Sequence, residues 1–370
     1  MTGPGETTPT TLGTSTAPIF VVGPSRSGTS MMRDILAGHQ DLWIGGETHY
    51  FDDLRVRLRG FERAPLSPEQ QTMCENYLLS LLDRPYGRGG DPDRSGKLSR
   101  EELRAGAAEI GPGADAYFVA YSELMAAKQG KSRWGEKTPR HVFRIDEILT
   151  VWPDAKVICM VRDPRAVVSS YRWWKRESAK MQAQPAKDET WALDDRRAEK
   201  SYNVFVISML WRAAMRASLE ASKRHGPERV RLQRYEDVVG SPETEIRELT
   251  DWLGLDYDPS LLDVAVTNSS FVLPGDRGVM TEAVDRWGTK LPPDELSVVQ
   301  RCCGSLMRSV GYERVQTKAS PLSVAWLWAK VPFAVGRAFV VNRHRLGNPL
   351  EYVARRMRLA TSRGNTSTPG

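Results

Sequence analysis

The 370-residue sequence contains little cysteine, and its first residues lack the features of a secretory leader. Its four cysteines show no metal-ligand spacing, and the adjacent pair Cys302 and Cys303 is poorly suited to a disulfide. Residues 1–16 are rich in Thr, Gly and Pro, with neither a basic region nor an apolar core, so no signal peptide is visible. We therefore predict a disordered tail at residues 1–16 and a reduced, cytoplasmic protein.

A lysine is also missing, from a segment that otherwise fits a nucleotide-binding loop. "GPSRSGTS" spans residues 23–30 and follows the pattern G-x-x-x-x-G-K-[ST], except that Thr29 occupies the lysine position. The strand expected at residues 154–161 is followed by Arg162, where an enzyme that binds a magnesium nucleotide usually has an acid. Both absences argue against a P-loop kinase, which remains the alternative enzyme class.

Positive charge is present but unevenly distributed. The formal net charge is +6 and the pI is about 9.1. Residues 316–370 contain nine basic side chains and one acidic side chain, so they carry about +8, and the rest of the chain is close to neutral. This excess favours an anionic ligand without naming one, and we predict no nucleic-acid partner.

Apolar runs and helical patterns alternate along the chain. "APIFVVG" (residues 17–23) reads as a buried strand, and "TSMMRDILAGH" after it has helical spacing with a stop at Gly38. The same order recurs at residues 154–161, followed by a helix from Pro164, and at residues 229–235. Strands that alternate with helices predict an α/β, P-loop-like, three-layer fold with a central parallel sheet flanked by helices.

The loop between the first strand and helix has the composition of an anion site. A helix N-terminus offers unpaired N–H groups and a positive dipole end, and Gly28 lets the backbone approach a ligand closely. Ser27, Thr29 and Ser30 add hydroxyl donors, and Arg26 adds a planar, permanent cation. The alternative is a Gly/Ser turn that only caps the helix; the strand–loop–helix context favours anion binding.

A second pair of residues, Arg162 and Ser170, is spaced to reach one further phosphate. Arg162 follows a strand, and Ser170 lies eight residues later, near the second turn of the next helix. The alternative for Arg162 is a local salt bridge to Asp163.

Together these elements resemble the sulfotransferases that use 3′-phosphoadenosine 5′-phosphosulfate (PAPS). "GPSRSGTS" is similar to their 5′-phosphosulfate loop, and "RDPRAVVSS" is similar to their 3′-phosphate motif, with Arg162 and Ser170 at its arginine and serine positions. "GGETHYF" (45–51), "EKTP" (136–139) and "RYEDVVGSP" (234–242) are similar to segments of the tyrosylprotein, heparan sulfate and bacterial members. The resemblance implies a sulfotransferase domain at residues 17–315 and PAPS as co-substrate.

The resemblance also implies roles for particular residues. Glu47 is the candidate general base, with a pKa raised by partial desolvation, and His49 is the alternative base. Lys137 would stabilise the bridging oxygen of the leaving group, Arg26 is a further catalytic and donor-binding candidate, and Tyr235 would line the donor pocket.

Without the family, each of these residues also has a structural interpretation. Glu47 reads as a surface acid after a turn, and Lys137 reads as half of an exposed pair with Glu136. One departure from the family is the late loop at residues 277–291, where Asp285 precedes Arg286 and Trp287 in place of a glycine. Donor contacts from this loop are left open.

Residues 91–102, "DPDRSGKLSREE", fit a twelve-residue calcium loop. Asp91, Asp93, Ser95 and Glu102 occupy its ligand positions 1, 3, 5 and 12. The alternative, an acidic turn that caps the following helix, is favoured.

The apolar stretch at residues 321–341 is interrupted by Lys330, Pro332 and Arg337, and two central cations argue against a membrane-spanning helix. We treat residues 316–370 as a basic, apolar C-terminal extension. It packs on the core or on another subunit of a homodimer, or it contacts anionic lipid as a peripheral anchor, and packing is favoured.

The acceptor hydroxyl is not identified by the sequence; carbohydrate, lipid, phenol and tyrosyl acceptors stay open. The charged, Trp-rich segment from Arg172 to Phe205 is expected to border the acceptor site. A third class, a membrane- or partner-binding protein with a vestigial nucleotide site, is disfavoured because Arg26, Glu47, Lys137, Arg162 and Ser170 occur together.

Overall fold

A computed structural model describes residues 17–82, 98–181, 202–264 and 286–333, together with residues 278, 279, 284 and 336. Five strands form one sheet in the order β2-β3-β1-β4-β5, and every neighbouring pair is parallel. The strands are β1 Ile19–Val22, β2 Leu42–Gly45, β3 Arg133–Lys137, β4 Lys156–Val161 and β5 Val230–Arg234. The predicted fold class, a parallel sheet flanked by helices, is confirmed.

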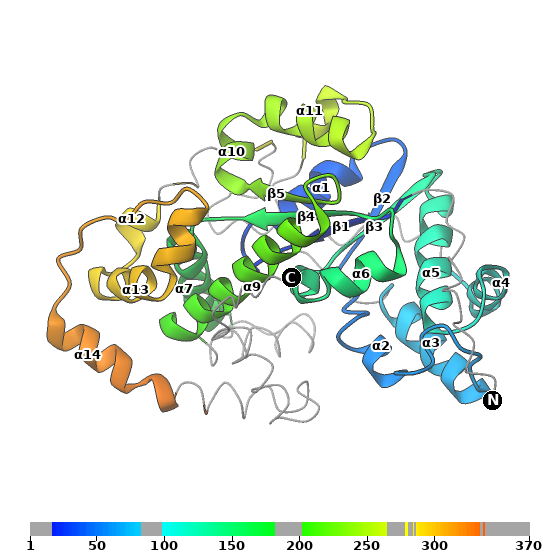
Figure 1. Cartoon of the computed structure of the whole chain (residues 1–370), viewed down its shortest axis with the longest axis horizontal. Helices are drawn as coiled ribbons and strands as arrows, with labels where there is room; N and C mark the ends of the chain where they lie inside the picture. The colour runs from blue at the N-terminus through cyan, green and yellow to red at the C-terminus, as the bar shows by residue number, and fades with distance from the viewer. Residues whose placement is uncertain are drawn as a thin grey trace, which may run out of the picture.

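Helices cover both faces of the sheet (Figure 1). One face carries α1 Thr29–Ala37, α10 Tyr235–Gly240 and α11 Pro242–Leu253. The other carries α5 Ala114–Lys128, α6 Ile145–Val151 and α9 Val204–His225. A strand covered on both sides must be apolar on both sides. Accordingly, Ile19 and Val21 of β1 pack into one core cluster, while Phe20 and Val22 pack into another.

The chain between β2 and β3 forms a helical layer beside the sheet. Its helices are α2 Leu54–Arg57, α3 Pro68–Ser80, α4 Arg100–Ile110 and α5. Two buried acids lie within it. Glu75 of α3 pairs with Arg100 and Arg104 of α4, and Asp115 of α5 pairs with Arg55 and Arg63. These ion pairs join the helices of this layer to one another.

A third core cluster lies where the later helices meet α9. The helices concerned are α7 Pro164–Met181, α12 Trp287–Lys290, α13 Pro293–Ser309 and α14 Pro321–Ala329. Val324 of α14 is buried in this cluster, and the ring of Trp328 lies 5.1 Å from that of Phe205. The start of the extension therefore packs on the core, as the favoured interpretation expects, although Leu322 and Trp326 remain largely exposed.

Two short 3-10 helices, η1 Pro139–Phe143 and η2 Pro259–Leu262, are also present. No helix within the described ranges is both long enough and apolar enough to span a bilayer. All four cysteines are buried and free. The domain limits at residues 17, 315 and 316 stay a prediction.

Candidate functional site

The carboxyl ends of the five parallel strands meet at one edge of the sheet, where open α/β sheets bind ligands. The predicted loop at residues 23–30 follows β1, Glu47 follows β2, and Lys137 ends β3. Arg162 follows β4 and Tyr235 follows β5. The strand order therefore brings residues that lie far apart in the sequence to a single edge.

The loop after β1 depends on two glycines. Gly28 begins α1 in the left-handed region with φ +88°, and a Cβ added there would lie 2.5 Å from Cδ2 of Tyr235. Gly23 has φ +137°, and a Cβ there would lie 2.6 Å from the carbonyl oxygen of Met160. A side chain at either position would collide with the strand or ring beside it, so the tight turn requires glycine.

The loop is joined directly to the predicted 3′-phosphate motif. The Arg26 guanidinium donates to the Ser170 hydroxyl at 3.0 Å, and Arg162 donates to the Arg26 carbonyl oxygen at 3.0 Å. The Arg162 guanidinium also lies 4.0 Å from the centre of the Tyr235 ring. Asp163, the alternative partner of Arg162, instead makes several hydrogen bonds to Arg165. The two predicted anion subsites thus adjoin.

Some polar atoms of this edge are buried without a protein partner. The Ser27 hydroxyl and Nε of Arg162 lack a hydrogen-bond partner among the described residues, although neither atom is exposed. Burying a polar atom without a partner costs roughly 1–3 kcal/mol, so such atoms usually await a ligand or water. Because both lie beside the loop, they suit an anion that accepts hydrogen bonds.

Glu47 and Lys137 face each other across β2 and β3. Lys137 Nζ donates to Glu47 Oε1 at 2.7 Å and to the Ser30 hydroxyl at 3.4 Å. Nε2 of His49 lies 3.3 Å from the other carboxylate oxygen of Glu47. The Lys137 side chain is only 4% exposed, whereas that of Glu47 is 26% exposed. The carboxylate is thus partly buried with one side exposed, and the ammonium lies between it and the loop at residues 23–30, the candidate anion loop.

The pKa of Glu47 is shifted in the opposite direction to the sequence-based prediction. Burial alone would raise the pKa of Glu47, but the charge of Lys137 and the hydrogen bond and charge of His49 outweigh it and lower the pKa well below its ordinary value. The prediction of a raised pKa is therefore wrong for this state. The suggested exposed pair of Lys137 with Glu136 is also wrong, because Lys137 binds Glu47 and Glu136 is buried.

Tyr171 belongs to this site and was missed by the sequence analysis. Burial raises the pKa of its hydroxyl, a hydrogen bond with Ser25 and the charge of Arg26 oppose that rise, and the charge of Glu47 adds to it. Its phenol therefore lies among loop residues and the candidate base. The only signal in the sequence was its position next to Ser170 in the helix after β4.

The late loop, at residues 277–291, is described only in part. Trp287 of α12 lies against Arg165, with the guanidinium carbon 4.0 Å from the ring centre. Arg172 of α7 donates to the Lys290 carbonyl oxygen at 3.5 Å. The end of this loop thus packs on the helix that carries the 3′-phosphate motif. Asp285 lies outside the described residues.

The calcium prediction is not supported. Asp91, Asp93 and Ser95 lie outside the described residues, and within the described part of the chain no cluster of acids, histidines and cysteines is arranged to hold a metal. Glu102 accepts from the Ser99 amide at 2.7 Å in a capping box and from Lys128 Nζ at 2.8 Å. Its carboxylate caps the N-terminus of α4, as the helix-capping alternative expects.

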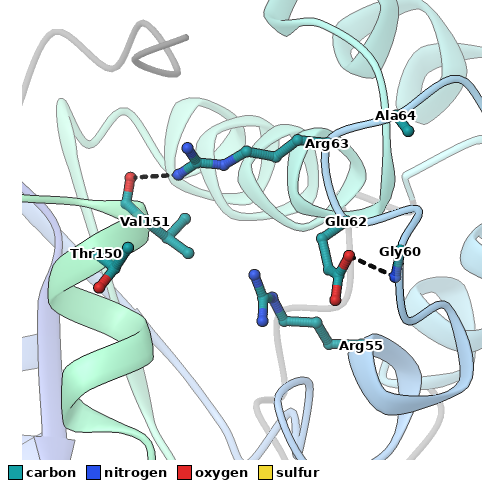
Figure 2. Close-up of a pocket in the computed structure, with 7 residues that line it drawn as sticks. All are labelled: Arg55, Gly60, Glu62, Arg63, Ala64, Thr150 and Val151. Atoms are coloured by element: carbon teal, nitrogen blue, oxygen red, sulfur yellow. Dashed lines mark hydrogen bonds between the residues drawn. The ribbon is translucent and has the colours of Figure 1, made fainter. Parts of the chain in front are cut away.

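A pocket between the helical layer and α6 shares no residue with this edge (Figure 2). It is lined by Arg55, Gly60, Glu62, Arg63, Ala64, Thr150 and Val151. Its two arginines are engaged by the protein, because both pair with Asp115 and Arg63 donates to the Val151 carbonyl oxygen at 3.0 Å. Nothing in this pocket calls for a ligand.

Comparison with known proteins points to one family. A sequence model described as "Sulfotransferase family" matches residues 18–259. Nodulation protein NoeE of Sinorhizobium fredii is 25% identical over 309 residues, which cover 80% of this chain and 66% of that protein. The omega-hydroxy-beta-dihydromenaquinone-9 sulfotransferase Stf3 of Mycobacterium bovis is 26% identical, covering 73% of this chain and 75% of the relative. Other relatives carry the names of carbohydrate and protein-tyrosine sulfotransferases.

A solved structure agrees in fold. The sulfotransferase domain from the curacin biosynthetic pathway aligns with a TM-score of 0.50 at 19% identity, over 81% of this chain and 99% of that domain. At this identity the likeness concerns the fold alone.

The match to NoeE spans slightly less than two thirds of that protein's length, so the relative contains sequence with no counterpart in the aligned region.

Proposed function

Because the chain belongs to the sulfotransferase family, we propose that it transfers a sulfuryl group from PAPS to an acceptor hydroxyl, as an enzyme of class EC 2.8.2. The observation that carries this proposal is the contact of Lys137 with both Glu47 and Ser30. This contact joins a carboxylate, a buried cation and the candidate anion loop through two consecutive hydrogen bonds.

The residues at the strand ends fit the donor. Its 5′-phosphosulfate would be held by the loop residues Arg26, Ser27, Gly28, Thr29 and Ser30. The unpartnered hydroxyl of Ser27 and the glycine turn support this assignment.

The 3′-phosphate of the donor would be held by a second group of residues. Arg162 and Ser170 form this subsite, with Tyr235 beside it. The unpartnered Nε of Arg162 gives it a further donor for a phosphate oxygen. Arg26 contacts Ser170, so the two subsites are linked.

In the proposed reaction the acceptor hydroxyl gives its proton to Glu47 while its oxygen forms a bond to sulfur. The bond between sulfur and the phosphate oxygen breaks, and adenosine 3′,5′-bisphosphate leaves. Lys137 stabilises the negative charge that develops on the oxygen of the leaving group, and Arg26 stabilises the charge on the transferred group. PAPS supplies the activated sulfuryl group.

The lowered pKa of Glu47 bears on its role as base. A carboxylate held by an ammonium is a weak proton acceptor. Lys137 lies close to both Glu47 and Ser30, so a small movement of its Nζ toward the loop would weaken the pair with Glu47. The pKa of Glu47 would then rise toward its ordinary range at the moment when a base is needed. His49 remains the second candidate for the base.

The acceptor is a hydroxyl whose class is open. The names of the relatives include a menaquinone derivative, carbohydrates and protein tyrosine. The exposed side of Glu47 leaves the candidate base accessible to such a molecule. A panel of quinols with a terminal hydroxyl, sugars, phenols and tyrosyl peptides therefore covers the acceptor classes that the family suggests.

Calorimetry tests the donor assignment without an acceptor. We expect adenosine 3′,5′-bisphosphate to bind with a Kd on the order of micromolar or below, and Mg-ATP to bind at least tenfold more weakly. Preferential binding of Mg-ATP would support the P-loop kinase alternative. Failure of both to bind would support a vestigial site.

A further inference from the structure

Glu136 is a buried carboxylate that the proposed reaction does not use. It precedes Lys137 on β3 and is 1% exposed. Successive side chains of a strand point to opposite faces of a sheet. Glu136 therefore lies on the face of Trp134 and the core cluster with Phe20, while Lys137 lies on the other face.

Glu136 is held by hydrogen bonds from four donor groups. Oε1 accepts from the Thr48 amide at 3.1 Å, from the Thr48 hydroxyl at 2.9 Å, and from the Thr138 hydroxyl. Oε2 lies 3.1 Å from Nδ1 of His141, a buried ring. Burial alone would raise the pKa of Glu136, but His141 and these hydrogen bonds outweigh it and lower the pKa. The group is ionised at neutral pH.

Two of the hydrogen bonds to Glu136 come from Thr48, which lies between the two candidate bases. Thr48 separates Glu47 from His49, and its carbonyl oxygen accepts from the Tyr77 hydroxyl at 2.6 Å. Its amide and hydroxyl are both directed to Glu136. The main chain between Glu47 and His49 is therefore fixed from two sides.

His49 gives a second sign that this loop is held in place. Its φ is +51°, in the left-handed region that residues other than glycine seldom adopt. Its amide donates to the Thr138 hydroxyl at 3.4 Å, and that hydroxyl in turn donates to Glu136. Such a conformation persists only where the surroundings fix it.

The segment that follows Glu136 also contacts the candidate anion loop. Gly23, the first residue of that loop, donates its amide to the Pro139 carbonyl oxygen at 3.2 Å. Residues 136–141 thus touch the loop after β1 on one side and the loop after β2 on the other.

We propose that Glu136 is a positioning residue, which clamps Thr48 so that Glu47 and His49 face Lys137 and the anion loop. This inference rests on the proposed function. The carboxylate takes no proton from substrate; it fixes the distance between the candidate base and the donor site. A displacement of about 1 Å in such a geometry can lower a rate about 10²-fold.

A buried carboxylate can also serve stability alone, so the test needs a matched control. Glu75 is buried as completely as Glu136, but it pairs with Arg100 and Arg104 in the helical layer. We expect Glu136→Gln to lower kcat by about 10- to 100-fold, with the Kd for adenosine 3′,5′-bisphosphate changed less than twofold. Glu75→Gln is expected to lower the midpoint of denaturation and to leave kcat unchanged.

A double-mutant cycle separates positioning from a general loss of structure. If Glu136 acts by positioning Glu47, then adding Glu136→Gln to the Glu47→Gln variant should lower the single-turnover rate of transfer little further. Equal losses in both backgrounds, or an unchanged kcat in Glu136→Gln, would overturn the proposal. If Glu136→Gln does not fold, Thr48→Val takes its place, because it removes the hydrogen bond from the Thr48 hydroxyl to Glu136. We expect Thr48→Val to lower kcat about tenfold, and the same double-mutant cycle with Glu47→Gln applies to it.

Failure of the proposed function would look different. If Glu47→Gln keeps full activity, Glu47 is not the base, whatever Glu136 does. The double-mutant cycle is then repeated with His49→Ala in place of Glu47→Gln, because Thr48 is also the neighbour of His49 in the chain. Coupling to His49 would keep the positioning role and move the base to the imidazole, and independence from both would overturn the role of Glu136.

Discussion

The helical layer and the strand-end edge both hold acidic side chains by basic ones, but the basic partners differ. In the helical layer, Glu75 and Asp115 are each held by two arginines. At the strand ends, Glu47 is held by a lysine and a histidine.

The basic partners differ in rigidity and in whether they can change charge. A guanidinium stays charged at all physiological pH values and holds a carboxylate in a fixed fork, so the arginine pairs connect helices. Lysine turns freely about its stem, and histidine gains or loses a proton near neutral pH. Arginine pairing therefore suits an acid that connects helices, whereas pairing with lysine and histidine can be adjusted, as the proposed reaction requires of Glu47.

The largest expected effect concerns Glu47→Gln. Glutamine keeps the size of the side chain but accepts no proton, so the transfer rate should fall about 10²- to 10⁴-fold in an acceptor assay. Affinity for adenosine 3′,5′-bisphosphate should stay unchanged by calorimetry. Glu75→Gln in the helical layer is the control, and an equal loss of activity there would erase the distinction between the two regions.

The pH dependence of kcat/KM sharpens the same assignment. A base works only when unprotonated, so activity disappears as the pH falls through the pKa of the base. The pKa of Glu47 is lowered, so with Glu47 as base the acid limb should lie well below pH 4.5, the ordinary value for a glutamate. An acid limb at or above pH 4.5 would contradict Glu47 as the base, and loss of activity in His49→Ala but not in Glu47→Gln would assign that role to His49.

A smaller effect is expected for Arg162→Ala. Removing a charge-assisted contact to the 3′-phosphate should weaken binding of adenosine 3′,5′-bisphosphate at least tenfold. Adenosine 5′-phosphosulfate lacks that phosphate, so it should bind the variant and the unmodified protein alike. Arg104→Ala removes an arginine from the helical layer and should leave both affinities unchanged. Equal loss of both ligands in Arg162→Ala would indicate misfolding.

The smallest effect concerns the C-terminal extension. Deletion of residues 318–370 should change the Kd for adenosine 3′,5′-bisphosphate less than twofold, because no described contact of the strand-end site comes from them. A tenfold loss would place part of the donor site in the extension. Flotation of the full-length protein with anionic vesicles at low salt tests the peripheral-anchor alternative, and absence of binding leaves packing as the role.

Much of the sheet was predictable, because β1 and β4 are apolar runs, β5 alternates apolar and polar residues, and each is followed by a turn or helix signal. The strands β2 and β3 were not predicted. β3 reads Arg-Trp-Gly-Glu-Lys, so its last two residues are charged and give no apolar run. Both charged side chains are buried against partners from other segments, namely Thr48 and His141 for Glu136 and Glu47 for Lys137, and periodicity cannot show such contacts.

Most residues of the candidate site, though not Tyr171, were predictable one by one, but the contacts between them were not. Motifs indicated Glu47 and Lys137 separately, whereas their contact depends on the register of β2 against β3. That register pairs Gly45 with Glu136 and is set by long-range packing. The pKa of Glu47 follows from this contact, so composition alone predicted its shift with the wrong sign.

The alternation of Glu136 and Lys137 on β3 has a consequence for how the sequence tolerates length changes. A single inserted or deleted residue within β3 would exchange the two faces, which would turn the ammonium into the aromatic core and the carboxylate of Glu136 toward Ser30 and Glu47. The sheet could still form, but both loops would lose their partners at once. β3 is therefore the segment in which an insertion or deletion should be least tolerated, and a library of one-residue insertions across residues 17–82 and 98–173 should show its deepest loss of activity at residues 133–137.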